Sequence, residues 1–174
     1  EKNILKKKPG YKFTAVERDK DTFQKMIINL ALPVNKELLD SVIGIGNKSV
    51  AEQVVNDKED TYSSAILDYC GTIDSFYNEI DDVMKRNLVK KGGYITLTLS
   101  ENDRLLNHSH HTTNHSNTYI KNCCVDEEVN GTKVTNDLVN FLVYNHKGYK
   151  IVNKFPYRDK RINMLLFIIK RIDE

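Results

Sequence analysis

The stretch that most constrains this chain is a pair of short apolar-patterned segments on either side of Gly44-Ile45-Gly46. The first segment predicts a short helix that ends at Gly44, because glycine adopts positive φ without penalty. Ser49-Val-Ala-Glu52 has the pattern of a capping box and predicts the start of a second helix. Backbone N–H groups at such a start have no partner inside the helix. Together with the positive helix end, these donors predict an anion site suited to phosphate.

The residues around this turn favour a nucleic-acid backbone as the anion. Glycine allows a close approach, Ile45 would anchor the turn in the core, and Lys48 adds a cation. Such contacts position a nucleic acid without reading its sequence. An ordinary corner between two helices is the simpler alternative. An ATP-binding P-loop is excluded, because the earlier glycine of that motif is missing and no strand precedes it.

Composition describes an ordinary globular chain. It has 174 residues, of which 40% are apolar and 29% charged, enough for one core or two small units. Its net charge is only +2, yet basic residues crowd both ends, which fits either a polyanion partner or two solvated faces. The odd set Cys70, Cys123 and Cys124, without a C-x-x-C, favours a reducing compartment. No apolar run approaches the roughly 20 residues that span a bilayer, so no membrane contact is expected.

Hydrophobic periodicity predicts an α+β fold, with a helical N-terminal half that contains the helix–hairpin–helix turn and a C-terminal half of antiparallel strands with one helix. Residues 21–32 fit either a helix capped by Asp21 and Gln24 or an alternating strand, and we favour the helix. The other expected helices are 38–43, 49–55, 62–70, 73–91 and 135–145, and the expected strands are 11–16, 94–99, 119–125, 149–155 and 162–172.

The same pattern predicts three segments. Residues 1–20 form a basic arm with a strand, residues 21–92 a helical RNA-binding domain, and residues 93–174 a mixed C-terminal extension. Residues 101–118 have low complexity and are expected to be a surface loop.

No arrangement of side chains predicts catalysis. His108, His110, His111 and His115 lie in the polar loop without carboxylate or cysteine support at defined spacing, so no metal site is expected. Acidic pairs such as Asp81-Asp82 are adjacent in sequence and point in different directions. With no credible nucleophile and base, we expect neither an enzyme nor a cofactor.

One segment resembles a known family. Leu32-Pro-Val-Asn-Lys36 followed by Ile43-Gly-Ile-Gly46 is similar to the N-terminal domain of small-subunit ribosomal protein thirteen, the universal head protein. The similarity covers about residues 26–91. It implies a structural protein that binds ribosomal RNA beside neighbouring head proteins, near the bridge to the large subunit and P-site tRNA. The residues expected to bind nucleic acid are Gly44, Ile45, Gly46, Asn47, Lys48, Ser49, Lys36, Lys90 and Lys91.

Two departures from that family set the expected location. The helix after Lys36 is about one turn shorter, and the family's Arg-rich tail is absent. A divergent mitochondrial small subunit accommodates both, so the resemblance implies a mitochondrial location. The alternative is a helix–hairpin–helix or winged-helix DNA-binding module of replication or repair, with the basic tip Arg158–Arg161 as its wing.

Overall fold

The computed structural model describes residues 13–33, 42–46, 49–69, 71–101, 131–159 and 162–173. Contacts divide the chain into two compact units, Glu1–Asp57 and Lys58–Glu174, and each unit is described by itself. The segments 1–20, 21–92 and 93–174 expected from the sequence stay a prediction. The expected strand at 119–125, and the expected loop at 101–118 beyond its first residue, lie outside the described residues.

Over its described residues, the first unit contains two parallel strands and two helices. Its elements are β1 (Phe13–Val16), α2 (Lys20–Ala31), β2 (Val42–Gly46) and α4 (Val50–Val54). The helix expected near residues 21–32 is confirmed, but its cap is Asp19 and not Asp21 or Gln24: the Asp19 side chain accepts a hydrogen bond from the Thr22 N–H at 2.8 Å. That bond to the charged carboxylate lowers the pKa of Asp19.

The glycine turn is a correction to the sequence-based account. Gly44-Ile45-Gly46 lies in strand β2, paired in parallel with residues 14–16 of β1, and the helix expected at 38–43 is wrong over Val42 and Ile43. The backbone groups that a turn would leave for phosphate are directed to a neighbouring strand instead. The capping box is confirmed: the Ser49 N–H donates to the Glu52 carboxylate at 2.7 Å, and the Glu52 N–H donates to Ser49 Oγ at 3.1 Å.

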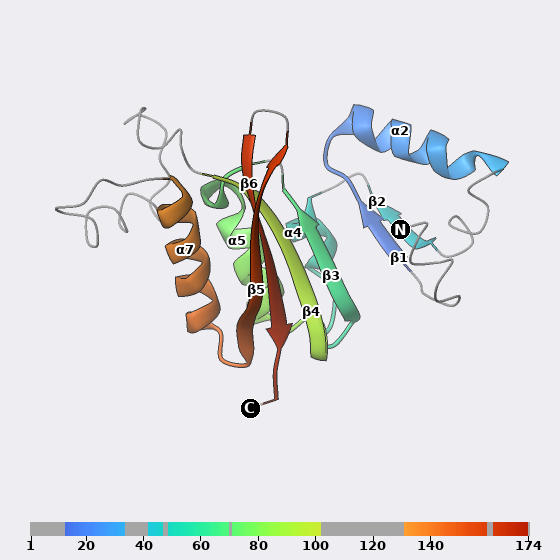
Figure 1. Cartoon of the computed structure of the whole chain (residues 1–174). Helices are drawn as coiled ribbons and strands as arrows, with labels where there is room; N and C mark the ends of the chain where they lie inside the picture. Colours follow the sequence, from blue (N-terminus) through green and yellow to red (C-terminus); the bar gives the residue numbers. More distant parts are fainter. Residues whose placement is uncertain are drawn as a thin grey trace. The chain divides into compact units, whose positions relative to one another are not determined.

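In the part that the structure describes, the second unit is a four-stranded sheet with two helices (Figure 1). Its elements are β3 (Tyr62–Asp68), α5 (Ile73–Lys85), β4 (Val89–Ser100), α7 (Gly131–Asn145), β5 (Tyr149–Asp159) and β6 (Ile162–Arg171). The strand order is β3-β4-β6-β5, with β3 and β4 parallel and β6 antiparallel to both of its neighbours. The chain crosses the sheet twice in the same direction, through α5 and then α7. Right-handed crossovers therefore place both helices on one face.

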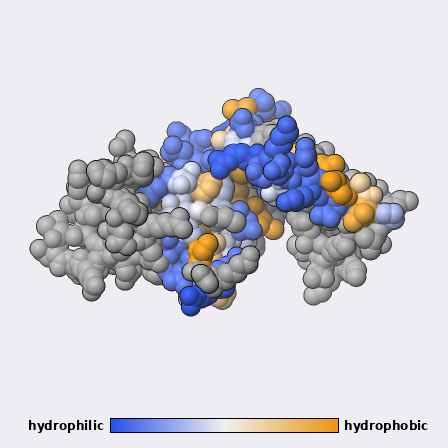
Figure 2. Space-filling model, turned by 90° about the horizontal axis from the view of Figure 1, so that it is seen from above, coloured by the Kyte–Doolittle hydropathy of each residue, from blue (hydrophilic) through white to orange (hydrophobic). Residues whose placement is uncertain are grey.

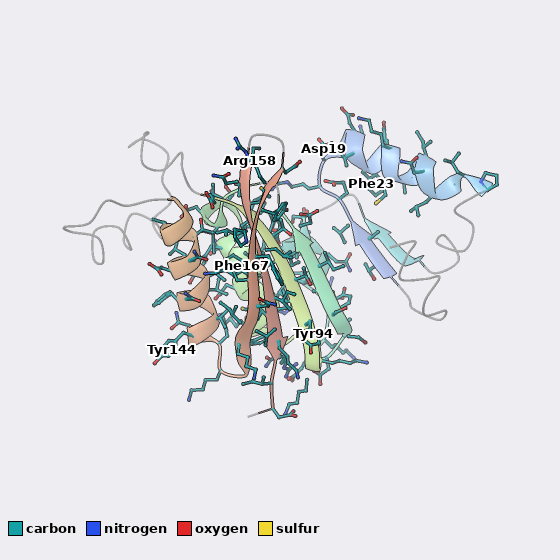
Figure 3. All side chains as sticks on the ribbon, viewed as in Figure 1. Asp19, Phe23, Tyr94, Tyr144, Arg158 and Phe167 are labelled. Carbon is teal, nitrogen blue, oxygen red and sulfur yellow. The ribbon has the colours of Figure 1, made fainter. Side chains whose placement is uncertain are left out.

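The core of this unit lies between that face and the two helices. Leu67, Leu97 and Phe167 are aligned across β3, β4 and β6 and are buried, with Phe167 near the middle of the sheet (Figure 3). One face of α5 packs against these side chains. That face is apolar because the apolar residues of α5 recur at helical spacing. The buried residues of α5 are Ile73, Tyr77, Ile80, Val83 and Met84.

The expected fold class is therefore wrong. The helix expected at 62–70 is strand β3, and the sheet is mixed, whereas only antiparallel strands were expected. The helix predicted at 73–91 is confirmed over Ile73–Lys85, but its predicted end is wrong, because residues 89–91 belong to β4. The helix predicted at 135–145 and the hairpin of the last two strands are confirmed. Among the described residues, no helix is both long and apolar enough to cross a membrane.

A buried arginine ties the sheet together at the end where β3 and β4 begin. Arg171 is 5% exposed and donates to the carboxylates of Asp60 at 2.6 Å and Glu59 at 2.8 Å. It also donates to the backbone carbonyls of Asn87 at 2.9 Å and Val89 at 2.7 Å. This clamp joins the end of β6 to the turn before β3 and to the start of β4.

Candidate functional site

The strongest candidate for a site is the opposite end of the sheet, where the parallel strands β3, β4 and β5 terminate. We call this end the carboxyl edge. β5 runs parallel to β4 because both are antiparallel to β6. In Figure 3, Arg158 marks this edge and Tyr94 marks the other. Open α/β sheets bind ligands outside the carboxyl ends of their parallel strands, since the loops and charged side chains that follow these strands converge there.

Asp68 provides a carboxylate at this edge. It is the last residue of β3, and its side chain is exposed. Leu67 is buried, and successive side chains of a strand alternate, so Asp68 lies on the face away from α5 and α7. The described residues offer this carboxylate neither an ion pair nor a hydrogen bond from a side chain. A cationic or hydrogen-bonding ligand can therefore reach it.

Tyr69 turns the other way and fixes the chain after β3. Its ring stacks on Phe76 of α5, with centroids 4.0 Å apart and planes inclined by 12°. Its hydroxyl donates to the Glu79 carboxylate at 3.0 Å. Its backbone N–H donates to the Thr98 carbonyl at 3.1 Å. The chain next to Asp68 is therefore held from both α5 and β4.

The hairpin of β5 and β6 continues past the end of β4. Tyr157 is paired with Met164, which is paired in turn with Ser100, the last residue of β4. The Glu101 N–H donates to the Asn163 carbonyl at 2.9 Å, and Arg158 lies one position farther along β5. Figure 2 views the molecule from above, toward this edge, and its coloured surface is mainly hydrophilic with separate hydrophobic patches.

The first unit has a comparable strand end. Glu17 directly follows β1 and is half-buried, and its Oε1 accepts a hydrogen bond from the Asp19 N–H at 2.8 Å. A carboxylate after a parallel strand is the group that binds ribose hydroxyls in dinucleotide-binding folds. Glu17 is therefore a second candidate, considered within its own unit.

The residues predicted to bind nucleic acid are distributed differently from the expectation. Gly44, Ile45 and Gly46 form part of β2, and Ser49 caps a helix of only five residues. Lys90 and Lys91 lie at the start of β4, where Lys91 is 4.0 Å from Asp173. The positions outside the described residues are Lys36, Asn47 and Lys48. Nucleic-acid binding at these positions stays a prediction, although the turn that motivated it is a strand.

The histidines of the polar loop, His108, His110, His111 and His115, also lie outside the described residues. Within the part of the chain that the structure describes, no three histidine, cysteine or acidic side chains gather to hold a metal ion.

Sequence reasoning missed Asp68 and Tyr69 because it assigned them to a helix. A usable signal was present: the apolar run Ala65-Ile-Leu67 ends in an acidic residue, and Gly71 follows shortly after. A short apolar run that ends in acidic and glycine residues is also typical of a buried parallel strand and its loop.

Comparison with known proteins identifies the fold. No protein-family model matches the sequence, and no curated protein shows significant sequence similarity. The structure resembles that of a SAM-dependent methyltransferase from Methanosarcina mazei, with a TM-score of 0.56 and 11% identity over 98% of this chain and 86% of that one. It also resembles a protein from Pyrococcus horikoshii OT3, with a TM-score of 0.54 and 12% identity over 97% of this chain and 76% of that one. At such identities the likeness shows the fold alone.

These findings correct the earlier identification. The fold is methyltransferase-like α/β, so the resemblance to ribosomal protein thirteen is wrong, as are the ribosomal and helix–hairpin–helix or winged-helix DNA-binding functions. The expected partners are wrong for the same reason; they were ribosomal RNA, head proteins, the bridge protein and P-site tRNA. The expectation of a non-enzymatic protein loses its basis as well, because the fold resembled is that of a methyltransferase. A mitochondrial location stays a prediction.

Proposed function

We propose that this chain binds S-adenosylmethionine (SAM) and belongs to a SAM-dependent methyltransferase. The observation that carries the proposal is the likeness to the Methanosarcina mazei methyltransferase, which extends over 98% of this chain. The mixed order β3-β4-β6-β5, with a carboxylate at the end of β3, gives the proposal a specific site.

Asp68 suits the charge of this ligand. When bound, SAM supplies a methyl group on a positively charged sulfur, which passes to a nucleophilic acceptor while the sulfur retains the bonding electron pair. An exposed carboxylate without a cationic partner among the described residues attracts such a sulfonium centre. Asp68 would hold the ligand by this attraction, and the Tyr69 contacts would keep the carboxylate in place.

Arg158 adds the complementary charge. Its guanidinium is exposed at the carboxyl end of β5, at the same edge of the sheet. SAM ends in an amino-acid group whose carboxylate pairs well with a guanidinium, because the two match in shape and charge. Arg158 pairs with Asn163 and so lies on the face of Phe167, opposite to that of Asp68, and β5 is three strands from β3. The two charges would therefore bind separate parts of a ligand.

Calorimetric titration of the purified full chain with SAM and with S-adenosylhomocysteine tests this proposal. The second ligand lacks the methyl group and the positive charge on sulfur. We expect Asp68→Asn to weaken SAM binding about fivefold, as for one partly solvated charge pair, and to change binding of the neutral ligand less than about twofold.

The comparison variant is Glu17→Gln in the other unit. Loss of SAM affinity in Glu17→Gln, with Asp68→Asn unchanged, would move the site to the end of β1. Absence of saturable SAM binding to the wild-type chain would refute the proposed function.

A further inference from the structure

The loop after β3 is held by more contacts than a surface connection needs. The Tyr69 N–H donates to Thr98 and the Ser100 N–H donates to the Gly71 carbonyl at 3.0 Å, so β4 holds the backbone at two points. Connecting segments are normally mobile and variable. A loop bonded at both ends to a central strand is instead a rigid platform.

Contacts from α5 fix the same loop through side chains. The Tyr69 ring lies against Phe76, and its hydroxyl reaches Glu79, one helical turn farther along. Parallel stacking at 4.0 Å defines the tilt of the ring, and the hydrogen bond defines its rotation. Tyr69 is 8% exposed, so the hydroxyl is largely shielded from water as an alternative partner.

Gly71 completes the arrangement by leaving room for the ring of Phe76. A Cβ at this position would lie 2.8 Å from Phe76 Cε2, closer than real Cβ contacts. Any side chain here would push Phe76 off Tyr69. The glycine is therefore explained by the stack on the neighbouring helix.

We propose that Tyr69, Phe76 and Glu79 are positioning residues that hold the Asp68 carboxylate in its ligand-binding orientation. We call this set the Tyr69 lock. The inference rests on the proposed function for the identity of the ligand. The positioning itself follows from the geometry: Asp68 immediately precedes Tyr69, and alternation directs the two side chains to opposite faces. Fixing Tyr69 from one face therefore fixes the backbone from which the Asp68 side chain extends on the other.

Tyr69 lies on the face opposite to Asp68, so the effect of the lock on a ligand at Asp68 must pass through Asp68. A catalytic site 1 Å too loose loses its function even when every group is present. Weakening the lock should therefore reduce the preference for SAM over S-adenosylhomocysteine, because only SAM carries the charge that Asp68 attracts. General damage to the fold would instead reduce the affinity for SAM and for S-adenosylhomocysteine by similar factors.

Two variants that weaken the lock, one conservative variant and one control test this inference. Tyr69→Phe keeps the stacked ring and removes the hydroxyl, whereas Glu79→Leu removes the acceptor. Glu79→Gln retains an acceptor and should restore most of the loss. Tyr144→Phe is the matched control, because Tyr144 is 85% exposed and points away from the sheet on α7 (Figure 3).

The expected result has two parts. The preference for SAM over S-adenosylhomocysteine falls about threefold in Tyr69→Phe and Glu79→Leu, and falls no further when either is combined with Asp68→Asn. Hydrogen exchange at the Ser100 amide, which bonds to Gly71, becomes about tenfold faster in the same variants and is unchanged in Tyr144→Phe.

Unchanged Ser100 exchange in both lock variants would overturn the inference, whether or not SAM binds. Faster exchange with an unchanged SAM preference would also overturn it, because the loop would then be loosened without effect on Asp68. If the wild-type chain binds no SAM, the proposed function fails, and faster Ser100 exchange still supports the lock as the device that fixes this loop.

Discussion

Tyr149 shows how a single hydroxyl can limit the stability of the sheet. The residue is 6% exposed, and its hydroxyl has no hydrogen-bond partner among the described residues. Burial raises its pKa to about 12, an effect that Arg171 opposes and the carboxylates of Asp60 and Glu59 reinforce. A buried polar atom left unpaired costs free energy even when the surrounding clamp is complete.

Tyr149→Phe should therefore increase the free energy of unfolding at pH 7, by about 1 kcal/mol. Its effect on alkaline unfolding follows from the shifted pKa. An unfolded tyrosine ionises near pH 10 and the folded Tyr149 near 12, so wild-type stability falls as pH rises through this window. The free energy of unfolding of the variant should fall less steeply with pH in this window. Some pH dependence should remain, because the pKa of Tyr77 is also raised.

Urea unfolding at pH 7 and at steps from pH 9 to 11.5 measures both effects, with Tyr144→Phe as the exposed control. Lower stability of Tyr149→Phe at pH 7 would show that the hydroxyl has a hydrogen-bond partner. An unchanged fall of stability between pH 9 and 11.5 would show that the pKa of Tyr149 is not raised in the folded chain.

The pairing of β3 with β4 depends on a glycine at an irregular point of the register. The register shifts between Tyr62 and Ser64, opposite the start of β4. A Cβ on Gly93 would collide with the Ser63 carbonyl oxygen and would lie 2.8 Å from both the Lys90 carbonyl oxygen and Val89 Cγ1. Gly92 has open space around it but a φ of 77°. The two neighbouring glycines therefore serve different purposes.

Gly93→Ala should destabilise the chain by about 2 to 3 kcal/mol, because backbone atoms cannot yield as a flexible side chain would. Gly92→Ala should cost only about 1 kcal/mol, the cost of a left-handed backbone conformation for alanine. Thermal and urea unfolding of the two variants in parallel gives the order. Equal losses, or a larger loss in Gly92→Ala, would contradict the proposed contact with β3.

The same elements explain what the sequence could and could not predict. Helices α5 and α7 were found because a long apolar face at helical spacing is a local signal. β3 was assigned to a helix, and β2 to the end of a helix and a turn, because a short apolar run fits either structure and the parallel partner is distant in sequence. Asp68 was missed for that reason: its place at the edge depends on the pairing of β3 with β4, which no local pattern contains.

In the second unit as a whole, one edge of the sheet carries stabilising contacts and the other carries the candidate ligand-binding groups. At one edge Arg171 joins the end of β6 to the turn before β3 and to the start of β4 through four short hydrogen bonds. At the other, Asp68 and Arg158 present charge to solvent. Stability held at one edge leaves the other free to carry ligand-binding groups, as in other α/β folds.

NMR titration of the isotopically labelled full chain with SAM tests the central claim most directly. We expect saturable shifts of the Tyr69, Ser100 and Glu101 amides at the carboxyl edge, while the Tyr94 and Lys170 amides at the opposite edge stay in place. No saturable shifts, or shifts confined to Tyr94 and Lys170, would contradict the account.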